Sequence, residues 1–340
     1  MLREIRVKGD RAMKSFVVSL TTSFLLGLVP VCLHAENPKN VPQIDFLAVD
    51  PHPPRDPGFF DAFRQGLRDL GYMEGRDIKI ETRFAEGKLD ALDGLAKELL
   101  ALKVDVLVTD STIATAAAKR ATTSVPIVFA TTADPVAAGI VPTLGRPGGN
   151  ITGFAVILSE LVGKRLQLLN ETFPKIKRVA VISNPRHPAH PPAMQELEKA
   201  ARILHLNLAN FPIGSPEAFE PAFAEIRRWN AEAVFVFDDA FLDFHRERIA
   251  NLAISARLPS MFGYRLFVDG GGLMSYGPDL ADQFRRSAKL VDRILKGAKP
   301  GDLPIEQPAK FELVINAKTM KALGVAIPEA MFARADDVIH

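Results

Sequence analysis

The sequence predicts an α/β protein with two doubly wound lobes, each a parallel sheet with helices on both faces. Three observations support this fold class. Short apolar runs alternate with helical patterns, which is typical of strand–helix–strand units. The alternation stops at a turn-rich stretch, residues 145–150, and then starts again. About 300 residues follow the N-terminal leader, more than one hydrophobic core usually holds, so two lobes are expected.

The first run begins with an apolar strand and an amphipathic helix. In the helix, phenylalanine and leucine recur at spacings of three and four until Gly71 ends it. The same alternation continues to residue 130. The expected strands are 44–49, 78–84, 104–109 and 126–130, and the expected helices are 58–70, 89–102 and 113–121.

The second run follows the turn-rich stretch and is broken again at residues 270–277, which contain three adjacent glycines. A long amphipathic helix and a proline-rich segment, 299–308, come after that break. The expected strands are 178–183, 206–211, 233–237 and 311–315, and the expected helices are 158–173, 193–204, 219–229, 280–295 and a short one at the C-terminus.

Residues 13–35 have the layout of a secretory leader. Lys14 supplies a positive start, an uncharged apolar run follows, and Ala35 is a small residue suited to cleavage. We therefore expect a signal peptide over residues 1–35 and a periplasmic or otherwise exported protein. The chain starts at Met1 or at Met13, which begins the more ordinary leader.

Two other readings of the leader stay open. Its apolar run is long enough for a membrane anchor, although several serines and threonines weaken its hydrophobicity. A lipid anchor on Cys32, the only cysteine, is the second alternative, although the residues before it lack the small residue of a lipoprotein cleavage site.

The composition excludes several function classes. Residues 1–35 hold five basic and two acidic residues, so 37 basic and 38 acidic residues remain after their removal and the net charge becomes about −1. This charge indicates neither a nucleic-acid nor an anionic-membrane partner. Without a cysteine beyond Cys32, the mature chain has no disulfide and no thiolate metal site.

Polar segments follow several expected strands. In doubly wound sheets, ligands bind outside the carboxyl ends of the strands, and two lobes facing each other there form a cleft for a small solute. The segments are Asp50–His52, Asp110–Thr112, Thr131–Pro135 with Thr132, Ala133 and Asp134, Ser183–Asn184, Asp238–Asp239 and Gly263–Tyr264.

Four segments, in unbroken order from about residue 43 to the C-terminus, resemble a known family. They are Gly71-Tyr-Met-Glu-Gly75, Ala133-Asp-Pro-Val136 with Gly145-Arg-Pro-Gly-Gly-Asn-Ile-Thr-Gly153, Gly271-Gly-Leu-Met-Ser-Tyr-Gly277, and Lys296 to Pro308 with Phe311-Glu-Leu-Val-Ile-Asn316. Together they are similar to the exported substrate-binding proteins of ABC importers, in the branch that includes aromatic amino acid binders.

The resemblance implies the type I periplasmic binding-protein fold, in which a three-segment hinge joins the lobes. The crossings would fall near 151–153, 274–277 and 303–308. The implied division places residues 41–152 plus 278–302 in lobe one and residues 153–277 plus 303–340 in lobe two.

The resemblance also implies roles for the strand-end residues. Ser111 and Thr112 would bind a carboxylate or another anion at a helix start, and Asp238 or Asp239 would pair with an ammonium group. Tyr264 and Tyr276 would stack on a ligand or hydrogen-bond to it. The loop Asp50-Pro-His-Pro-Pro54, which includes His52, and the loop Asp110-Ser-Thr-Ile113 depart from many relatives, which leaves the amino-acid class of ligand open.

Structural explanations stay open beside these roles. Ser111 and Thr112 can simply cap a helix, one of the two aspartates can be a cap or a solvated loop residue, and Asp134 followed by proline is an ordinary helix start. His187 and His190 lie among four prolines, which predicts that no helix places them on one face for a metal. No metal and no cofactor are expected.

These observations predict a solute-binding protein that delivers a small ligand to the membrane permease of an ABC importer and is not an enzyme. No nucleotide-binding fingerprint and no nucleophile elbow is present in the sequence. A monomer is expected. The alternative is a periplasmic ligand-sensing co-receptor for a chemotaxis or sensor-kinase system.

Overall fold

A computed structural model describes residues 41–50 and 58–340. The expected leader, its cleavage site and Cys32, and also His52, lie outside the described residues. Within them, no helix is both long enough and apolar enough to cross a membrane.

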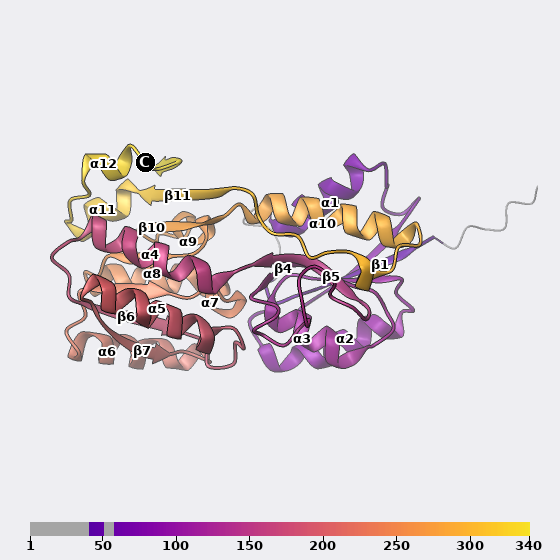
Figure 1. The fold of residues 1–340 in the computed structure, drawn as a ribbon, viewed down its shortest axis with the longest axis horizontal. Helices are drawn as coiled ribbons and strands as arrows, with labels where there is room; N and C mark the ends of the chain where they lie inside the picture. Colours follow the sequence, from indigo (N-terminus) through magenta and orange to yellow (C-terminus); the bar gives the residue numbers. More distant parts are fainter. Residues whose placement is uncertain (1–40, 51–57) are drawn as a thin grey trace, which may run out of the picture. The chain divides into compact units, whose positions relative to one another are not determined.

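The first sheet has five parallel strands, which Figure 1 shows in indigo to magenta. They lie in the order β2-β1-β3-β4-β5. The strands are β1 (Gln43–Ala48), β2 (Lys79–Phe84), β3 (Val106–Thr109), β4 (Ile127–Ala133) and β5 (Ile151–Val156). The helices that belong to this sheet are α1 (Phe59–Asp69), α2 (Leu92–Ala101), α3 (Thr112–Ala121) and α10 (Leu280–Leu295).

Alternating side chains of β1 explain why helices cover both faces of this sheet. Ile44 and Phe46 pack into one apolar cluster with residues of α1 and α10, whereas Leu47 and Val49 pack into another with residues of α2 and α3. Because neighbouring residues of a strand point to opposite faces, a strand with apolar residues on both faces needs a helix layer on each side. Figure 1 shows α1 and α10 on one face and α2 and α3 on the other.

The second sheet has seven strands in the order β12-β11-β10-β9-β8-β6-β7. Neighbouring strands in this sheet pair in parallel, except β10 and β11, which are antiparallel. The strands are β6 (Arg178–Ser183), β7 (Asn207–Pro212), β8 (Ala233–Val236), β9 (Ser260–Phe262), β10 (Met274–Pro278), β11 (Phe311–Asn316) and β12 (Asp337–Ile339). The helices are α4 (Leu158–Thr172), α5 (His190–Leu204), α6 (Phe219–Arg228), α7 (Ala240–Phe244), α8 (Arg246–Ser255), α9 (Arg265–Asp269), α11 (Ala317–Leu323) and α12 (Glu329–Phe332).

The two sheets repeat one topology. The order β7-β6-β8-β9-β10 in the second sheet matches β2-β1-β3-β4-β5 in the first, as expected from two runs of the same alternation. This confirms the predicted α/β fold class with two doubly wound sheets. In this order the strand sequence reverses between β1 and β3 and again between β6 and β8, and such switch points are where doubly wound folds bind ligands.

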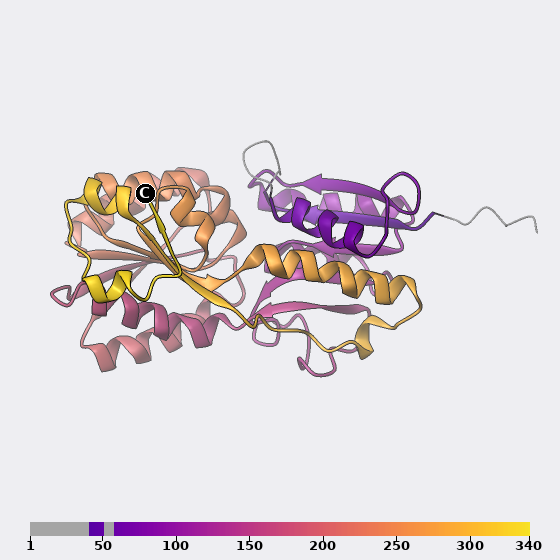
Figure 2. The same cartoon turned by 90° about the horizontal axis from the view of Figure 1, so that it is seen from above.

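Three chain segments connect the sheets. They run from β5 to α4, from β10 to α10, and from the short helix Pro300–Asp302 to β11. In Figure 2, α10 lies beside the first sheet although it follows β10 of the second. The division into lobes at 41–152 plus 278–302 and 153–277 plus 303–340 stays a prediction.

Two elements extend three residues beyond the sequence expectation. The strand expected over 126–130 continues to Ala133 as β4, and α5 starts at His190 rather than at residue 193. Pro191 and Pro192 occupy the first turn of α5, where their missing N–H groups would have no intrahelical partner in any case. The prolines therefore begin this helix instead of preventing it.

Gly66 allows α1 and α10 to pack closely. A Cβ atom on Gly66 would lie 2.1 Å from the carbonyl oxygen of Arg285 and 2.9 Å from Cβ of Ala288. We predict that Gly66→Ala lowers the free energy of unfolding by about 1–3 kcal/mol in urea titrations, because the helices must move apart.

Gly94→Ala is the matched control. Gly94 lies within α2, and a Cβ atom there meets nothing within 4 Å. This substitution is expected to stabilise the protein by about 0.5–1 kcal/mol. Equal stability of the Gly66 variant and the unchanged protein would contradict the close α1–α10 contact.

Candidate ligand-binding site

A cavity of about 270 Å³ lies at the carboxyl ends of strands from both sheets. Asp50 follows β1, Asp110 follows β3, and Thr131 lies near the end of β4. Asp238 follows β8 of the second sheet, two residues beyond its end. The cavity therefore occupies the position that the two switch points predict.

Most of the expected site residues line this cavity. They are Asp50, Ser111, Thr112, Thr132, Ala133, Asp238, Asp239 and Tyr264. Asp134, Asn184 and Tyr276 are not part of the lining, and His52 lies outside the described residues. The part that each residue takes in ligand binding stays a prediction.

The three residues outside the lining have structural contacts. The carboxylate of Asp134 accepts hydrogen bonds from the backbone N–H and the hydroxyl of Ser159, 2.9 and 3.0 Å away. Asn184 donates from Nδ2 to Oδ2 of Asp239 at 3.0 Å. The backbone carbonyl of Tyr276 accepts a hydrogen bond from Arg165 at 2.6 Å. Asn184 can therefore act on the cavity by orienting Asp239.

The hydroxyl of Ser111 both donates and accepts a hydrogen bond inside the protein. It donates to Oδ1 of Asp110 at 2.7 Å and accepts the backbone N–H of Ala114 at 3.3 Å, which caps α3. Oδ2 of Asp110 accepts the backbone N–H of Val49 at 2.9 Å and so ties the ends of β3 and β1 together. Burial raises the pKa of Asp110 to about 7 against these hydrogen bonds.

Asp238 forms a buried ion pair with Arg165 of α4. Nη1 of Arg165 lies 2.8 Å from Oδ2 of Asp238, and the side chains are 0% and 2% exposed. Burial raises the pKa of Asp238 although the Arg165 charge acts in the opposite direction. Asp238 is therefore held in place by a group that lies behind the cavity wall.

Asp239 and Asp243 belong to the start of α7. Oδ1 of Asp239 accepts the backbone N–H of Leu242 at 2.9 Å and caps that helix. Burial raises the pKa of Asp239 to about 6. Burial, followed by the charges of Asp238 and Asp239, holds the pKa of Asp243 well above its usual range. Oδ1 of Asp243 is buried, and no residue of the described chain donates a hydrogen bond to it.

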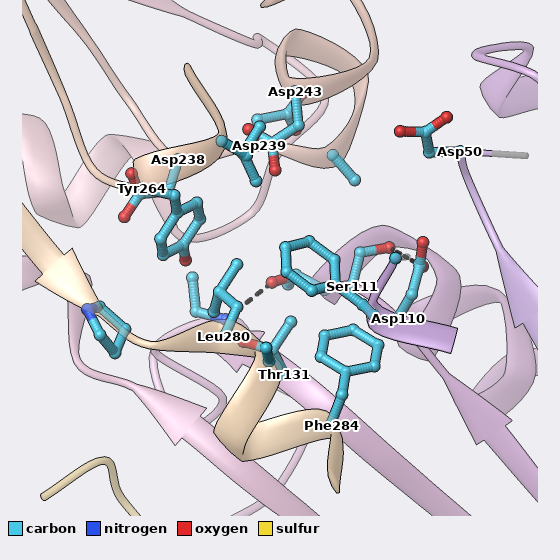
Figure 3. A pocket seen from close by; sticks show the side chains of 18 of the residues that line it. Asp50, Asp110, Ser111, Thr131, Asp238, Asp239, Asp243, Tyr264, Leu280 and Phe284 are labelled. Carbon is cyan, nitrogen blue, oxygen red and sulfur yellow. Dashed lines mark hydrogen bonds between the residues drawn. The ribbon is translucent and has the colours of Figure 1, made fainter. Parts of the chain in front are cut away.

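The apolar part of the lining comes from the first sheet and its helices. Phe59 of α1 and Phe284 of α10 stack with ring centroids 4.9 Å apart, and Leu280 and Phe46 also line the cavity. In Figure 3, Leu280, Thr131 and Phe284 lie on one side of the pocket, and Asp238, Asp239 and Asp243 lie on the other.

Comparison with known proteins identifies the family. Residues 48–339 match the family model described as ABC transporter substrate binding protein. The chain belongs to this family. Its fold is that of the type I periplasmic binding proteins, as the structural likenesses also show.

Three known proteins are similar to this chain over most of its length. A tyrosine-binding protein of Clostridioides difficile is 27% identical over 262 residues, which cover 77% of this chain and 75% of that protein. A conserved domain protein from Vibrio cholerae matches with a TM-score of 0.81 and 27% identity, over 88% of this chain and 99% of that chain. A Streptococcus pneumoniae ABC domain solved in complex with L-Trp matches with a TM-score of 0.80 and 25% identity, over the same shares.

Several lining residues of this substrate-binding protein were not predicted from the sequence. Phe59 and Phe284 belong to regular apolar stripes of amphipathic helices, which predict core packing rather than a cavity wall. Asp243 and Arg246 lie on the short helices α7 and α8 after the strand-end segment. A signal for Asp243 was available, because it follows Asp239 by four residues and so shares its helix face.

His187 and His190 lie side by side although no helix places them on one face, because His187 precedes α5. Their rings stack with centroids 4.2 Å apart, and with Asp239 they offer ligand atoms within 4.8 Å of one another. Both nitrogens of His190 are engaged: Nδ1 accepts the backbone N–H of Asn184, and Nε2 lies 3.0 Å from the carbonyl oxygen of Asp238. His190 therefore supports the backbone under the cavity.

The buried carboxyl groups predict a pH dependence of stability. The pKa of Asp110 and that of Asp243 are higher in the folded state, so unfolding releases their protons and stability falls as pH rises. The pKa of His187 and that of His190 are lowered by burial, which opposes this trend only below about pH 6.5. Between pH 6.5 and 8 we expect the free energy of unfolding to fall by about 1–2 kcal/mol.

Urea titrations at several pH values measure this slope, and Asp110→Asn is the control. The variant should show a shallower fall between pH 6.5 and 8, whatever its absolute stability. A stability that is constant or increases over this interval would contradict the buried state of these carboxyl groups.

Proposed function

We propose that the protein is the exported solute-binding component of an ABC importer, which closes its two lobes over a small ligand and delivers it to a membrane permease. The observation that carries this proposal is the cavity lined by strand ends and helices of both sheets. A ligand that contacts both lobes at once stabilises the closed form, which is how binding can be signalled to a permease.

The relatives support the same function. The tyrosine-binding protein and the domain solved with L-Trp are similar over most of this chain, and both names describe small-molecule binding. The stacked Phe59 and Phe284 give the cavity an apolar wall suited to a ring. We propose a ligand of the size of an amino acid or a similar small metabolite, binding without chemical conversion by a periplasmic monomer after cleavage near Ala35.

A thermal-shift screen of the purified protein against amino acids, amines, purines, sugars and small acids tests this function. A ligand that binds the folded state raises the melting temperature, by an amount that grows with concentration. X-ray scattering with a stabilising ligand should then show a smaller radius of gyration. Turnover of the ligand, or saturation without any compaction, would overturn the proposal.

Uptake measurements separate transport from sensing. Cells that lack this protein should lose high-affinity uptake of the identified ligand and regain it when the protein is restored. Unchanged uptake together with lost chemotaxis or kinase signalling would favour the sensory role instead.

A further inference from the structure

The two ends of the cavity differ in chemistry. One end is apolar and is formed by Phe59, Leu280 and Phe284 from helices of the first sheet. The other is acidic and is formed by residues that follow β8, as Figure 3 shows. A ligand that fills both ends therefore has an apolar body and a polar group on the side of the second sheet.

The acidic end holds more carboxyl groups than guanidinium groups among the described residues. Asp238, Asp239 and Asp243 lie with Arg165 behind the cavity wall and Arg246 in the lining. Arg165 pairs with Asp238, and Arg246 lies 3.4 Å from Asp50.

One carboxylate oxygen at this end has no hydrogen-bond donor among the described residues. It is the buried Oδ1 of Asp243, whereas the Asp238 carboxylate has both Arg165 and the Tyr264 side chain as partners. Buried carboxylate oxygens without donors are unfavourable, and a cationic N–H donor in the cavity would satisfy them.

Two lining groups that could bind a ligand carboxylate, the Ser111 hydroxyl and the Arg265 guanidinium, are already engaged. The Ser111 hydroxyl donates to Asp110, so it has no proton left for a ligand. Asp239 and Asp279 cap the starts of α7 and α10 with their own carboxylates. Arg265, the other arginine among the described lining residues, lies 2.7 Å from Asp337.

The total charge of the lining points in the same direction. Among the described residues it contains eight acidic side chains against the arginines 246 and 265: Asp50, Asp110, Asp238, Asp239, Asp243, Asp269, Asp279 and Glu312. An additional anion in this cavity would be opposed by like charges close by, and a cation would be favoured.

We propose, on the basis of the solute-binding function above, that the ligand is an organic cation with a flat apolar body and no carboxylate, such as an aromatic amine. Its ring lies against Phe59 and Phe284, and its ammonium group donates hydrogen bonds to Asp243 on the side of the second sheet. Because the two ends belong to different sheets, such a ligand links both lobes. This assigns a ligand class that differs from the amino acids bound by the relatives.

Matched ligand pairs that differ by one carboxylate test the inference. Tyramine, tryptamine and phenethylamine are compared by isothermal titration calorimetry with tyrosine, tryptophan and phenylalanine, and 3-phenylpropionate serves as the acid without an amine. We expect at least one amine to bind about 100-fold more tightly than its amino acid, and 3-phenylpropionate not to bind.

A charge variant tests the position of the ammonium group. Asp243→Asn should weaken amine binding about 10- to 100-fold, because the carboxylate acceptor is lost. Asp93→Asn, on the exposed surface of α2 and paired there with Arg120, should bind the amine as the unchanged protein does.

The outcomes separate this inference from the proposed function. An amino acid that binds as tightly as its amine, or the failure of all three amines to bind, overturns the cationic ligand class. The solute-binding function would still stand if any ligand of the wider screen binds and compacts the protein. Equal amine affinity of the Asp243 variant overturns the assignment of Asp243.

Discussion

Replacing Arg165 with methionine is expected to lower the free energy of unfolding by about 3–5 kcal/mol. The variant would keep much of the apolar stem of the side chain but remove the charge that balances Asp238. Urea titration at pH 7 measures the change, and the midpoint should fall without a large change in slope.

The reason lies in the position of Arg165 among buried groups. It comes from α4 and is 0% exposed, so none of its contacts can be replaced by water without opening the core. Nε donates to the carbonyl oxygen of Tyr276 at 2.6 Å, and Nη2 lies 3.5 Å from the carbonyl oxygen of Gly263. One side chain therefore joins α4, β10 and the end of β9, and its removal leaves Asp238 as an uncompensated buried charge.

A double variant distinguishes lost charge balance from lost packing. Arg165→Met combined with Asp238→Asn removes both charges, and we expect it to recover at least half of the lost stability. If the double variant is no more stable than Arg165→Met alone, then the hydrogen bonds to the two carbonyl oxygens, and not the ion pair, determine the effect.

Much of the fold could be predicted because apolar periodicity depends directly on burial. The apolar run of β1 and the stripe of α10 correspond to side chains in closed cores, and the expected ranges of both agree with the structure to within a residue. The start of α5 could not be predicted in the same way. A proline breaks a helix when it lies in the helix interior, but it favours a helix when it lies in the first turn. Pro191 and Pro192 lie in the first turn of α5, and the sequence pattern alone does not show where that turn falls.

The candidate site could be predicted in outline but not in its chemistry. The strand-end rule places Asp110, Ser111 and Asp238 at the cavity. Which of their polar atoms remain free for a ligand depends on side-chain hydrogen bonds, such as that from Ser111 to Asp110, and no spacing in the sequence encodes these. The carboxylate role expected for Ser111 stays a prediction, whereas its position at the cavity agrees with the strand-end rule.

Asp243→Asn is expected to stabilise the ligand-free protein while weakening its binding of an amine. The Asp243 carboxylate is buried, no described residue donates a hydrogen bond to its Oδ1, and Asp238 and Asp239 add like charges nearby. A neutral amide of the same shape avoids the burial of a charge and the repulsion between like charges, so we expect the free energy of unfolding at pH 8 to rise by about 1–2 kcal/mol. Thermal and urea unfolding measure this, with Asp93→Asn as the control expected to change stability by less than about 0.5 kcal/mol.

The size of this stabilisation should depend on pH, which ties it to the carboxylate. The pKa of Asp243 is raised in the folded state, so at low pH this carboxyl group keeps its proton in the unchanged protein and is neutral, as the amide is. The difference in the free energy of unfolding between Asp243→Asn and the unchanged protein should therefore shrink as pH falls from 8 towards 5. A binding residue that destabilises its own fold is expected where a ligand supplies the missing charge. An Asp243→Asn protein that is less stable than the unchanged protein at pH 8 would show that the carboxylate has a partner inside the fold, and the ammonium position would then have to be sought at Asp238 or Asp239.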